Sequence, residues 1–293
     1  MSTNSINIRP LTTALGAEVL GVDLSKPLSN TEFDAVHRAL LDHLVIFFRD
    51  QEVSPDEQIA FGRKFGALDV HPFAPALADH PEVMTIVKEP DDQSGIRFGG
   101  IWHSDTTFYE EPVMGSILYA REVPEVGGDT MFANMYLAYE TLSDGMKEML
   151  SRLNAIHSPA KSYGKGGRLS DTGKAKKNIS MKTRTDDGED IYAEVIHPVI
   201  RTHPETGERV VYVNNGFTSH IEGLSKDESR WLLDHLYKTA WDVEIQCRFR
   251  WQAGSVAFWD NRVCQHFAVS DYFPARRVME RVTVAGDKPY FTP

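Results

Sequence analysis

The sequence predicts an α+β or mainly-β fold in which helices flank a core of strands. Three segments near the C-terminus, 243–251, 255–260 and 278–287, are rich in β-branched and aromatic residues, and turn residues separate them. This pattern is typical of successive strands. Helical patterns are concentrated earlier in the chain and recur once between the strands, and the chain has no internal repeat. A repeating parallel βαβ sheet would instead require regular alternation of the two element types.

The N-terminal segment is expected to form short strands, a helix and a buried strand. Residues 6–29 alternate apolar and polar side chains between Gly and Pro breaks, which indicates short strands. Asn30 is expected to cap the helix that follows. Four apolar residues share one stripe of this helix at helical spacing: Phe33, Val36, Leu40 and Leu41. The apolar run at residues 44–48 predicts a buried strand.

Capping boxes predict two further helices. Residues 54–57 combine a capping box with proline at the first helical position. The apolar side of this helix comes from Phe61 and Phe65. A second capping box at residues 225–228 opens a helix that is expected to end near Ala240. Between them, residues 134–153 carry another helical pattern.

Composition narrows the class of protein. The 293 residues are 25% charged and 41% hydrophobic, so we expect one globular domain over residues 1–293. The formal net charge of -11 argues against a nucleic-acid partner. Two cysteines, Cys247 and Cys264, are too few for a disulfide framework and favour a reducing compartment, although a single bridge stays open. No apolar leader or membrane-length apolar run occurs, so a soluble, cytoplasmic protein with no membrane partner is expected.

One segment departs from the pattern of the rest of the chain. Residues 161–178 mix four glycines with Lys, Ser and Asp, and their hydrophobic periodicity fades. A long loop inside a compact domain is usually a lid or a flexible insertion. A solvated insertion with no role fits the sequence equally well.

The short stretch WHSDTTF holds the first candidate for chemistry. In a strand, His103 and Asp105 would project from the same face. His266 follows an apolar, β-favouring segment and is the best third member among the 11 histidines. Two histidines and one carboxylate form the facial triad that suits oxygen-activating Fe(II). Taken alone, His-X-Asp also fits a zinc site or a core histidine that is hydrogen-bonded to an aspartate.

The surrounding motifs carry a family resemblance over nearly the whole chain. The stretches WHSDTTF, VGGDTMFANM and WDNRVCQHFAVSDYFPARRVMER resemble the taurine and phenoxyacetate dioxygenase family, whose members depend on Fe(II) and 2-oxoglutarate. LGAEVLGVDL and GDKPYF add to the likeness at the two ends. The resemblance implies a double-stranded β-helix, the jelly roll of the clavaminate synthase-like enzymes, with helices packed around it.

The resemblance also implies roles for individual residues. It assigns His103, Asp105 and His266 to the metal, and Thr130 and Arg277 to 2-oxoglutarate. Independently, a distal carboxylate needs a fixed cation, and arginine offers a planar, bidentate fork. Arg281 lies four residues beyond Arg277, shares its face in a strand, and is expected to hold the substrate anion, whereas Arg276 is expected to be a solvated neighbour.

Likeness to the taurine enzymes extends unevenly into the substrate pocket. Besides Arg281, four residues match substrate-contacting positions: His71, Ser162, Tyr163 and Phe217. Ala74 stands where the taurine enzymes have Tyr, and Gly99 stands where they have Asn. Both changes remove polar contacts and leave space, which disfavours taurine and favours a larger or more apolar anion.

We therefore expect a dioxygenase that uses Fe(II), 2-oxoglutarate and O2 to hydroxylate a small anionic substrate. The candidate substrates are aryloxyalkanoates, sulfonates and alkyl sulfates, often with cleavage of a C–O or C–S bond. A zinc-dependent hydrolase would leave Thr130 and Arg277 without a role, and a non-catalytic anion-binding jelly roll would make the metal ligands incidental. A homodimer or homotetramer is compatible with the sequence.

Overall fold

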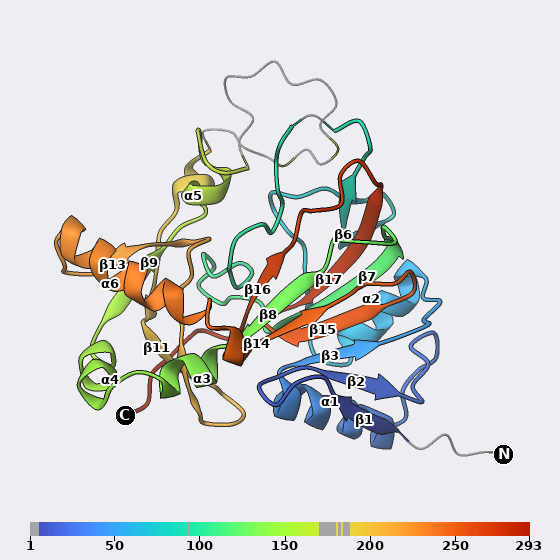
Figure 1. Cartoon of the computed structure of the whole chain (residues 1–293), viewed down its shortest axis with the longest axis horizontal. Coiled ribbons are helices and arrows are strands. Elements are labelled where there is room, and N and C mark those ends of the chain that lie inside the picture. The colour runs from blue at the N-terminus through green and yellow to red at the C-terminus, as the bar shows by residue number, and fades with distance from the viewer. Residues whose placement is uncertain (1–5, 93, 170–179, 181–182, 184–187) are drawn as a thin grey trace.

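Two facing β-sheets form the centre of the protein (Figure 1). The computed structural model describes residues 6–92, 94–169, 180, 183 and 188–293. Within these residues, the larger sheet has nine strands in the order β1-β2-β3-β15-β7-β17-β6-β5, with β4 also paired to β17. The smaller sheet has the order β14-β8-β16. This arrangement is the predicted jelly roll.

The strands of the two sheets come from distant parts of the chain. The larger sheet contains β1 (Asn7–Pro10), β2 (Ala17–Leu20), β3 (Val45–Phe48), β4 (Leu68–Asp69), β5 (Ala76–Leu77), β6 (His80–Lys88), β7 (Gly115–Glu122), β15 (Val256–Asp260) and β17 (Arg277–Val284). The smaller sheet contains β8 (Thr130–Asn134), β14 (Gln246–Phe249) and β16 (Cys264–Ala268). Neighbouring strands are antiparallel except for the parallel pair β2 and β3. The predicted strand at 243–251 is shorter, because residues 243–245 form a 3-10 turn.

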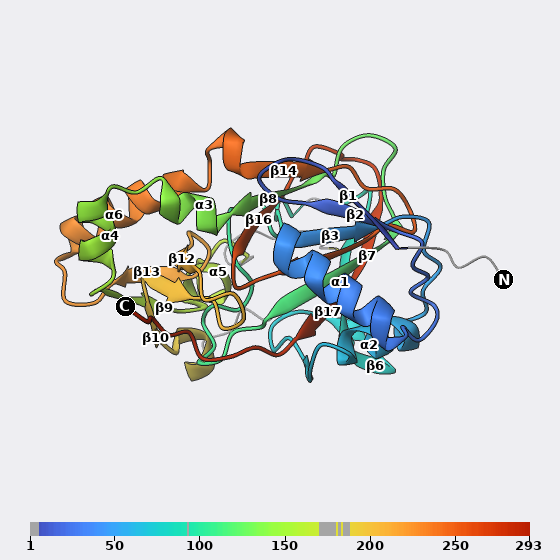
Figure 2. The same ribbon diagram turned by 90° about the horizontal axis from the view of Figure 1, so that it is seen from below.

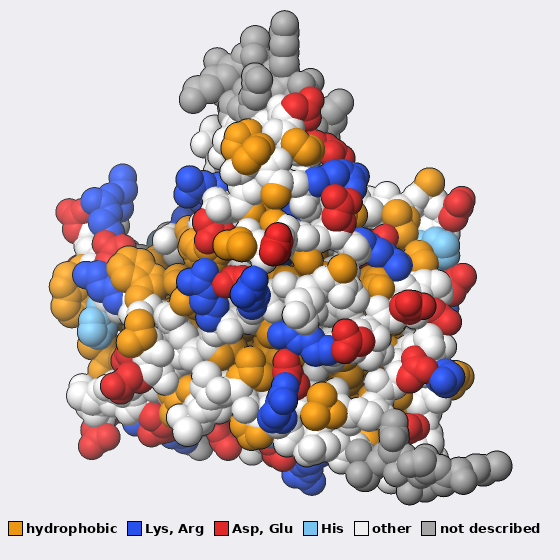
Figure 3. Space-filling model, turned by 45° about the vertical axis from the view of Figure 1, so that its right-hand side comes forward, with side chains coloured by type: hydrophobic (Ala, Val, Ile, Leu, Met, Phe, Trp, Pro, Cys, Tyr) orange, Lys and Arg blue, Asp and Glu red, His pale blue; other side chains and the backbone are white. Residues whose placement is uncertain are grey.

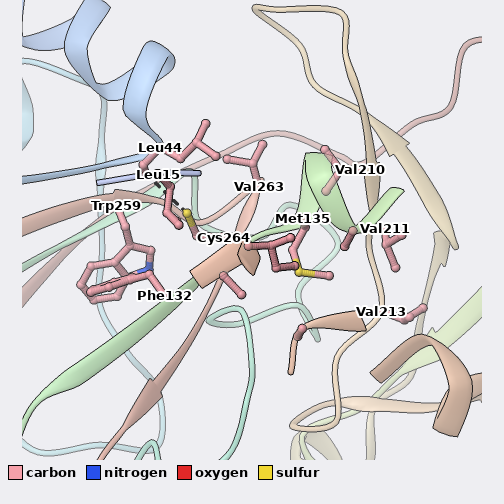
Figure 4. Close-up of a cluster of buried hydrophobic side chains, with 14 of the residues drawn as sticks. Leu15, Leu44, Phe132, Met135, Val210, Val211, Val213, Trp259, Val263 and Cys264 are labelled. Carbon is pink, nitrogen blue, oxygen red and sulfur yellow. Dashed lines mark hydrogen bonds between the residues drawn. The ribbon is translucent and has the colours of Figure 1, made fainter. Parts of the chain in front are cut away.

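The two-residue period of β3 sends its side chains to both faces of the larger sheet. Phe47 points between the sheets, where its ring stacks on Phe249 at 3.9 Å between centroids. Phe132 and Trp259 meet in the same interior with centroids 5.6 Å apart (Figure 4). Ile46 and Phe48 belong instead to the hydrophobic cluster on the other face. The predicted strand at 44–48 is therefore buried on both sides, which explains its unbroken apolar run.

Two helices cover the outer face of the larger sheet (Figure 2). They are α1 (Asn30–His43) and α2 (Pro55–Arg63), and both begin with a capping box. The prediction of Asn30 as the first cap is wrong by one residue. Ser29 is the cap, because its hydroxyl accepts from the Glu32 amide while the Glu32 carboxylate accepts from the Ser29 amide.

The remaining elements gather on the side of the molecule away from α1 and α2 (Figure 1). They are α3 (Met135–Glu140), α4 (Asp144–Leu150), α5 (Ala160–Tyr163), α6 (Lys226–Thr239), β9 (Asn154–His157), β10 (Val195–Pro198), β11 (Ile200–Thr202), β12 (Arg209–Val211), β13 (Thr218–Ile221) and a 3-10 turn (Glu189–Tyr192). The helical pattern predicted for 134–153 is two helices, because Ser143 caps a new helix at Asp144.

The glycine-rich segment 161–178 is only partly within the described residues. Residues 161–169 pack against the protein: Tyr163 and Leu169 lie in a buried aromatic cluster, and the Leu169 amide donates to the Ser162 carbonyl. Residues 170–178 lie outside the described part of the chain, so the lid stays a prediction.

Acidic and basic side chains are interspersed on the face shown in Figure 3. Within the described residues, no helix has the length and apolar character needed to cross a membrane. Cys247 and Cys264 are buried free thiols, and the Cys264 Sγ lies 3.5 Å from the Leu44 carbonyl (Figure 4).

The cap of α6 yields a stability prediction. The Ser225 hydroxyl accepts from the Glu228 amide at the first turn of the helix. We expect Ser225→Ala to lower the free energy of unfolding by about 1 kcal/mol, because an amide of the first turn loses its acceptor. Urea unfolding measures this change. Ser225→Asp is the matched control and should retain most of the stability, and equal losses in both variants would contradict the capping role.

Candidate active site

A backbone pairing brings the two histidines together. His103 and His266 form an antiparallel bridge in which each amide donates to the other's carbonyl, at 3.1 and 2.8 Å. Their rings consequently lie side by side, with centroids 4.1 Å apart. His266 belongs to β16, but His103 does not belong to a regular strand. The prediction of a strand at this position is wrong, since the chain enters a turn at Asp105 directly after the bridge.

Asp105 is held in place by its backbone and by its side chain. The Asn261 side chain accepts from the Asp105 amide at 2.7 Å and donates to the Asp105 carbonyl at 2.9 Å. The Ser116 hydroxyl donates to Asp105 Oδ2 at 2.8 Å. The carboxylate is fixed by these contacts rather than by the geometry of a strand.

The three side chains converge on one point. Ligand atoms of His103, Asp105 and His266 all lie within 4.8 Å of one another, and all three residues are buried. The His103 Nδ1 lies 2.7 Å from the Ile101 carbonyl, which leaves Nε2 to face Asp105. Burial lowers the pKa of both histidines, so both rings are neutral and able to bind a metal. Burial alone would raise the pKa of Asp105, but Arg281 and the neighbouring groups hold it below its usual value.

Arg281 lies against Asp105 rather than standing free in the cavity. Its Nη1 is 2.9 Å from both carboxylate oxygens of Asp105, and its Nη2 is 3.5 Å from the Met84 sulfur. The Nε of Arg281 is buried and has no hydrogen-bond partner within the described chain. Arg281, which is predicted to hold the substrate anion, therefore also contacts Asp105, the carboxylate of the metal site.

Arg277 and Thr130 lie on opposite sheets and line the same cavity. Arg277 is 6% exposed, and its closest hydrogen-bond acceptor, the Gly128 carbonyl, is 3.4 Å away. No carboxylate pairs with it in the part of the chain that the structure describes. The Thr130 hydroxyl accepts from the Trp251 indole at 2.9 Å, which leaves its own proton free to donate.

Arg277 and Arg281 share a face of β17, as predicted, together with Met279. That face points between the sheets, since Met279 belongs to the same hydrophobic cluster as Phe132 and Trp259. Arg276 points outward and pairs with Glu89 and Glu122 at the surface. Arg276 directly precedes β17, so the solvated arginine lies outside the strand that carries the two cavity arginines.

The cavity that His103 and His266 line is small, with a volume of about 40 Å³. Its wall carries His103, His266, Thr130, Arg277 and Arg281, together with apolar side chains. His103, His266 and the buried Arg277 therefore face one space, in which Arg277 can pair with the anionic end of a small molecule.

The predicted substrate residues form a neighbouring aromatic group. The Tyr163 hydroxyl lies 3.4 Å from His71 Nε2, and the Phe73 amide donates to His71 Nδ1. Burial, followed by the charge of Arg281, lowers the pKa of His71 to about 3, so its ring is neutral. Phe217 stacks on Tyr163 with centroids 6.4 Å apart.

Ser162, whose role as a substrate contact stays a prediction, is held by hydrogen bonds within the protein. Its side chain is fully buried, and its hydroxyl donates to the Gly216 carbonyl at 3.1 Å while accepting from Arg168 at 2.8 Å. Its hydrogen bonds join α5 to the loop that carries Phe217.

A second layer of buried polar groups supports the turn after Asp105. The Thr107 hydroxyl accepts from the Asn214 amide group at 2.9 Å and lies 3.1 Å from His157 Nδ1. His197 lies beside His157, with ring centroids 5.1 Å apart, and its Nε2 is 2.9 Å from the Tyr109 carbonyl. Burial lowers the pKa of His197 to about 4 and that of His157 well below its usual value.

Sequence reasoning missed the residues that orient the site, namely Asn261, Ser116 and Trp251. Asn261 lies within the motif WDNRV, and its nearness in the sequence to the metal ligand His266 could have pointed to it. No sequence pattern pointed to Ser116 or Trp251, because their contacts with Asp105 and Thr130 form only in the folded chain.

Fold and triad together define the class of protein: a jelly-roll dioxygenase that depends on 2-oxoglutarate. The family model described as "Taurine catabolism dioxygenase TauD, TfdA family" matches residues 7–283. The chain therefore belongs to the TauD/TfdA family. Membership in this family of enzymes decides against the zinc hydrolase and the non-catalytic binding module.

Two sequence relatives and one solved structure match nearly the whole chain. The chain is 36% identical to an alkylsulfatase of Acinetobacter baylyi, over 97% of the chain and 86% of that protein. It is 35% identical to an alpha-ketoglutarate-dependent sulfate ester dioxygenase of Pseudomonas putida, over 97% of the chain and 91% of that protein. The crystal structure of a taurine dioxygenase from Burkholderia xenovorans superimposes with a TM-score of 0.80 at 35% identity, covering 97% of this chain and 92% of that one.

The amide of Asn261 can be tested as the support of Asp105. Asn261→Ala leaves the buried amide and carbonyl of Asp105 without side-chain partners, so we expect a loss of about 2–4 kcal/mol in the free energy of unfolding. Divalent-metal affinity should also fall at least about tenfold, as is typical when a group that orients a ligand is removed. Urea unfolding and metal titration measure the two effects. A stable Asn261→Ala protein with unchanged metal affinity would contradict this role.

Buried neutral histidines predict a fall in stability under mildly acidic conditions. His71, His157 and His197 have lowered pKa values in the folded protein, whereas in the unfolded chain their pKa is about 6.5. The unfolded state therefore binds more protons below pH 6.5, and each histidine removes about 1 kcal/mol of stability per pH unit as the pH falls toward the folded values.

Urea unfolding of the metal-free protein at pH 7.5, 6.5 and 5.5 measures how the free energy of unfolding changes with pH. These pH values lie above those at which most carboxylates titrate. His197→Gln should reduce the slope by the contribution of one titrating histidine, about 1 kcal/mol per pH unit. The same slope in both proteins would mean that His197 does not contribute.

Proposed function

We propose that this protein is an Fe(II)- and 2-oxoglutarate-dependent dioxygenase that oxidises a small organic monoanion, with sulfate esters as the first candidate. The observation that carries the proposal is the convergence of His103, Asp105 and His266 beside a cavity whose wall carries both histidines and the carboxylate-free Arg277. We further propose that residues 1–293 act as a single catalytic domain.

The donor set fits iron. Two neutral imidazoles and one ionised carboxylate leave three coordination positions for other ligands, which suits non-haem Fe(II). The ring of His103 is oriented by the Ile101 carbonyl, and the carboxylate of Asp105 by Ser116 and Arg281. Bound Fe(II) together with 2-oxoglutarate would activate O2 and supply the oxidant.

Arg277 and Thr130 suit the distal carboxylate of 2-oxoglutarate. A buried guanidinium without a carboxylate partner is costly, and a bidentate anion would offset that cost. Burial lowers the pKa of Arg277 without neutralising it. Thr130 adds one donor, because the Trp251 indole fixes its oxygen and leaves its proton to the ligand.

The primary substrate would lie between Arg281 and His71. Nε of Arg281 is an unused buried donor, and Nε2 of the neutral His71 is a second donor once Nδ1 has accepted from the Phe73 amide. Two donors suit the oxygens of a sulfate, sulfonate or carboxylate group. The two relatives that act on sulfate esters support sulfate as the first choice.

Oxidation at the carbon that bears the sulfate would cleave the ester. An alkyl sulfate R–CH2–OSO3⁻, O2 and 2-oxoglutarate would give R–CH(OH)–OSO3⁻, succinate and CO2. The hydroxylated ester would then break its C–O bond to give the aldehyde R–CHO and hydrogen sulfate. The residues of the chain contribute by holding the two anions at fixed places and by excluding water.

A screen for succinate release tests the function. Alkyl sulfates, alkyl sulfonates and aryloxyalkanoates are supplied in turn with Fe(II), 2-oxoglutarate and O2, and alkyl sulfates should give the highest kcat/KM. His103→Ala is the control and should abolish turnover. Substrate-dependent succinate release that survives His103→Ala would overturn the assignment of the metal site.

Replacing Arg277 tests the binding of 2-oxoglutarate. Arg277→Lys keeps the charge and loses the fork, so we expect the KM for 2-oxoglutarate to rise about 10- to 100-fold, which corresponds to the loss of one charge-assisted hydrogen bond. The KM for the sulfate ester should change much less. Steady-state kinetics with each substrate varied in turn separates the two effects, and an unchanged KM for 2-oxoglutarate would rule out this role.

A further inference from the structure

A second cavity, with a volume of about 340 Å³, adjoins the one that His103 and His266 line. Apolar side chains make up much of its wall: Ile86, Val87, Ile96, Phe98, Ala268, Val269 and Phe273. We call it the apolar chamber. Phe273 stands at its edge with 61% of its surface exposed. Exposed aromatic surface beside a concave apolar wall is typical of a ligand site.

Among the described residues, the charges around the apolar chamber leave little for a second ionic group to bind. Lys88 and Asp92 pair with each other at 3.1 Å. Arg277 lines both cavities, and the proposed function commits it to 2-oxoglutarate. Arg97 is exposed to solvent. The interior of the chamber therefore suits an uncharged, apolar group.

The two cavities share part of their walls. Ile86, Phe98, Ala268 and Arg277 line both of them. Gly99 lies beside this shared wall with φ of +70°, and a Cβ built there would lie 3.2 Å from the Ala268 Cβ and 3.7 Å from the His103 Cε1. A side chain at position 99 would therefore stand between the metal ligand and the chamber.

The aromatic side of the site offers less space. The ring of Tyr163 already packs on Phe73, with centroids 4.8 Å apart, and on Phe217. His71 contacts the same tyrosine. An anion can reach the donors of His71 and Arg281, but a long apolar group attached to it would collide with these rings.

We propose that the apolar chamber binds the alkyl group of the sulfate ester and that Gly99 keeps the passage to it open. This inference rests on the proposed function and adds to it the substrate class: medium-chain rather than short-chain sulfate monoesters. The sulfate lies at Arg281 and His71, the first carbons face the metal ligands, and the rest of the chain passes Gly99 to reach Ile96 and Phe273.

Linear alkyl sulfates from ethyl to decyl test the proposal. In the wild-type enzyme, kcat/KM should rise about fourfold for each methylene that enters the chamber, because burial of a methylene contributes about 0.8 kcal/mol. Gly99→Asn places a side chain in the passage, and Asn is among the residues that best tolerate a positive φ. The ratio of kcat/KM for decyl over ethyl sulfate should fall at least about tenfold in this variant.

Phe273→Ser provides a second variant with little risk to folding, because the side chain is mostly exposed. It should also lower the decyl-to-ethyl ratio, and Phe273→Leu should restore most of it. Trp231→Ser is the matched control: Trp231 is 66% exposed on α6, away from both cavities, and its replacement should leave the ratio unchanged. If Gly99→Asn does not fold, as judged by thermal unfolding, the Phe273 series decides.

The outcomes separate failure of this inference from failure of the proposed function. A flat chain-length profile, or a ratio unchanged in both variants, overturns the chamber as the alkyl site. If the variants raise the KM for 2-oxoglutarate but leave the decyl-to-ethyl ratio unchanged, the chamber is a passage for the cosubstrate. That result also overturns its assignment as the alkyl site. If alkyl sulfates are not turned over but sulfonates are, sulfate as the substrate fails, and the same series run with alkyl sulfonates decides the role of the chamber.

Discussion

The buried carboxylate of Asp105 is the constraint on which the rest of the site depends. Moving a charged group out of water costs several kcal/mol unless partners compensate. Here the Arg281 guanidinium contacts both carboxylate oxygens, Ser116 donates to one of them, and Asn261 holds the backbone on either side. Because Arg281 belongs to β17 and Asn261 follows β15, the partners of this carboxylate are in place only when the larger sheet is formed. The geometry of the metal site is in this sense a product of the whole fold.

The two-residue period of the strands decides which side chains enter the space between the sheets. Along β17 it sends Arg277 and Arg281 inward, whereas Arg276, directly before the strand, pairs with acidic residues at the surface. Along β8 and β16 it presents Thr130 and His266 from the opposite sheet. A shift of one residue in the register of either sheet would exchange the cavity residues for their neighbours. Packing such as the stacked pair of Phe47 and Phe249 fixes that register as firmly as the polar contacts do.

The sequence was sufficient wherever a local pattern carried the information. The capping boxes marked the starts of α2 and α6, the apolar run marked β3, and the spacing of Arg277 and Arg281 placed them on one face. Motif likeness supplied the triad and the jelly roll.

Features formed by contacts between distant residues were not visible in the sequence. Asn261 and Asp105 are 156 positions apart, so nothing local linked them. The bond between Ser162 and Gly216 and the pairing of Arg281 with Asp105 likewise exist only in the folded chain. The break at Ser143 was missed because a capping residue inside a helical pattern also fits one longer helix.

The balance of charge in the triad cavity favours a monoanionic substrate. Among the metal ligands and the residues that line the cavity, Asp105 contributes one negative charge, Arg277 and Arg281 contribute two positive charges, and the buried histidines are neutral. A divalent cation raises the positive excess to three charges, and dianionic 2-oxoglutarate reduces it to one. A single negative charge on the primary substrate then makes the loaded cavity neutral, whereas a dianion would leave an uncompensated charge in a medium of low polarity. A sulfate monoester meets this condition at every pH at which the fold is stable, because its remaining acidic group is fully ionised.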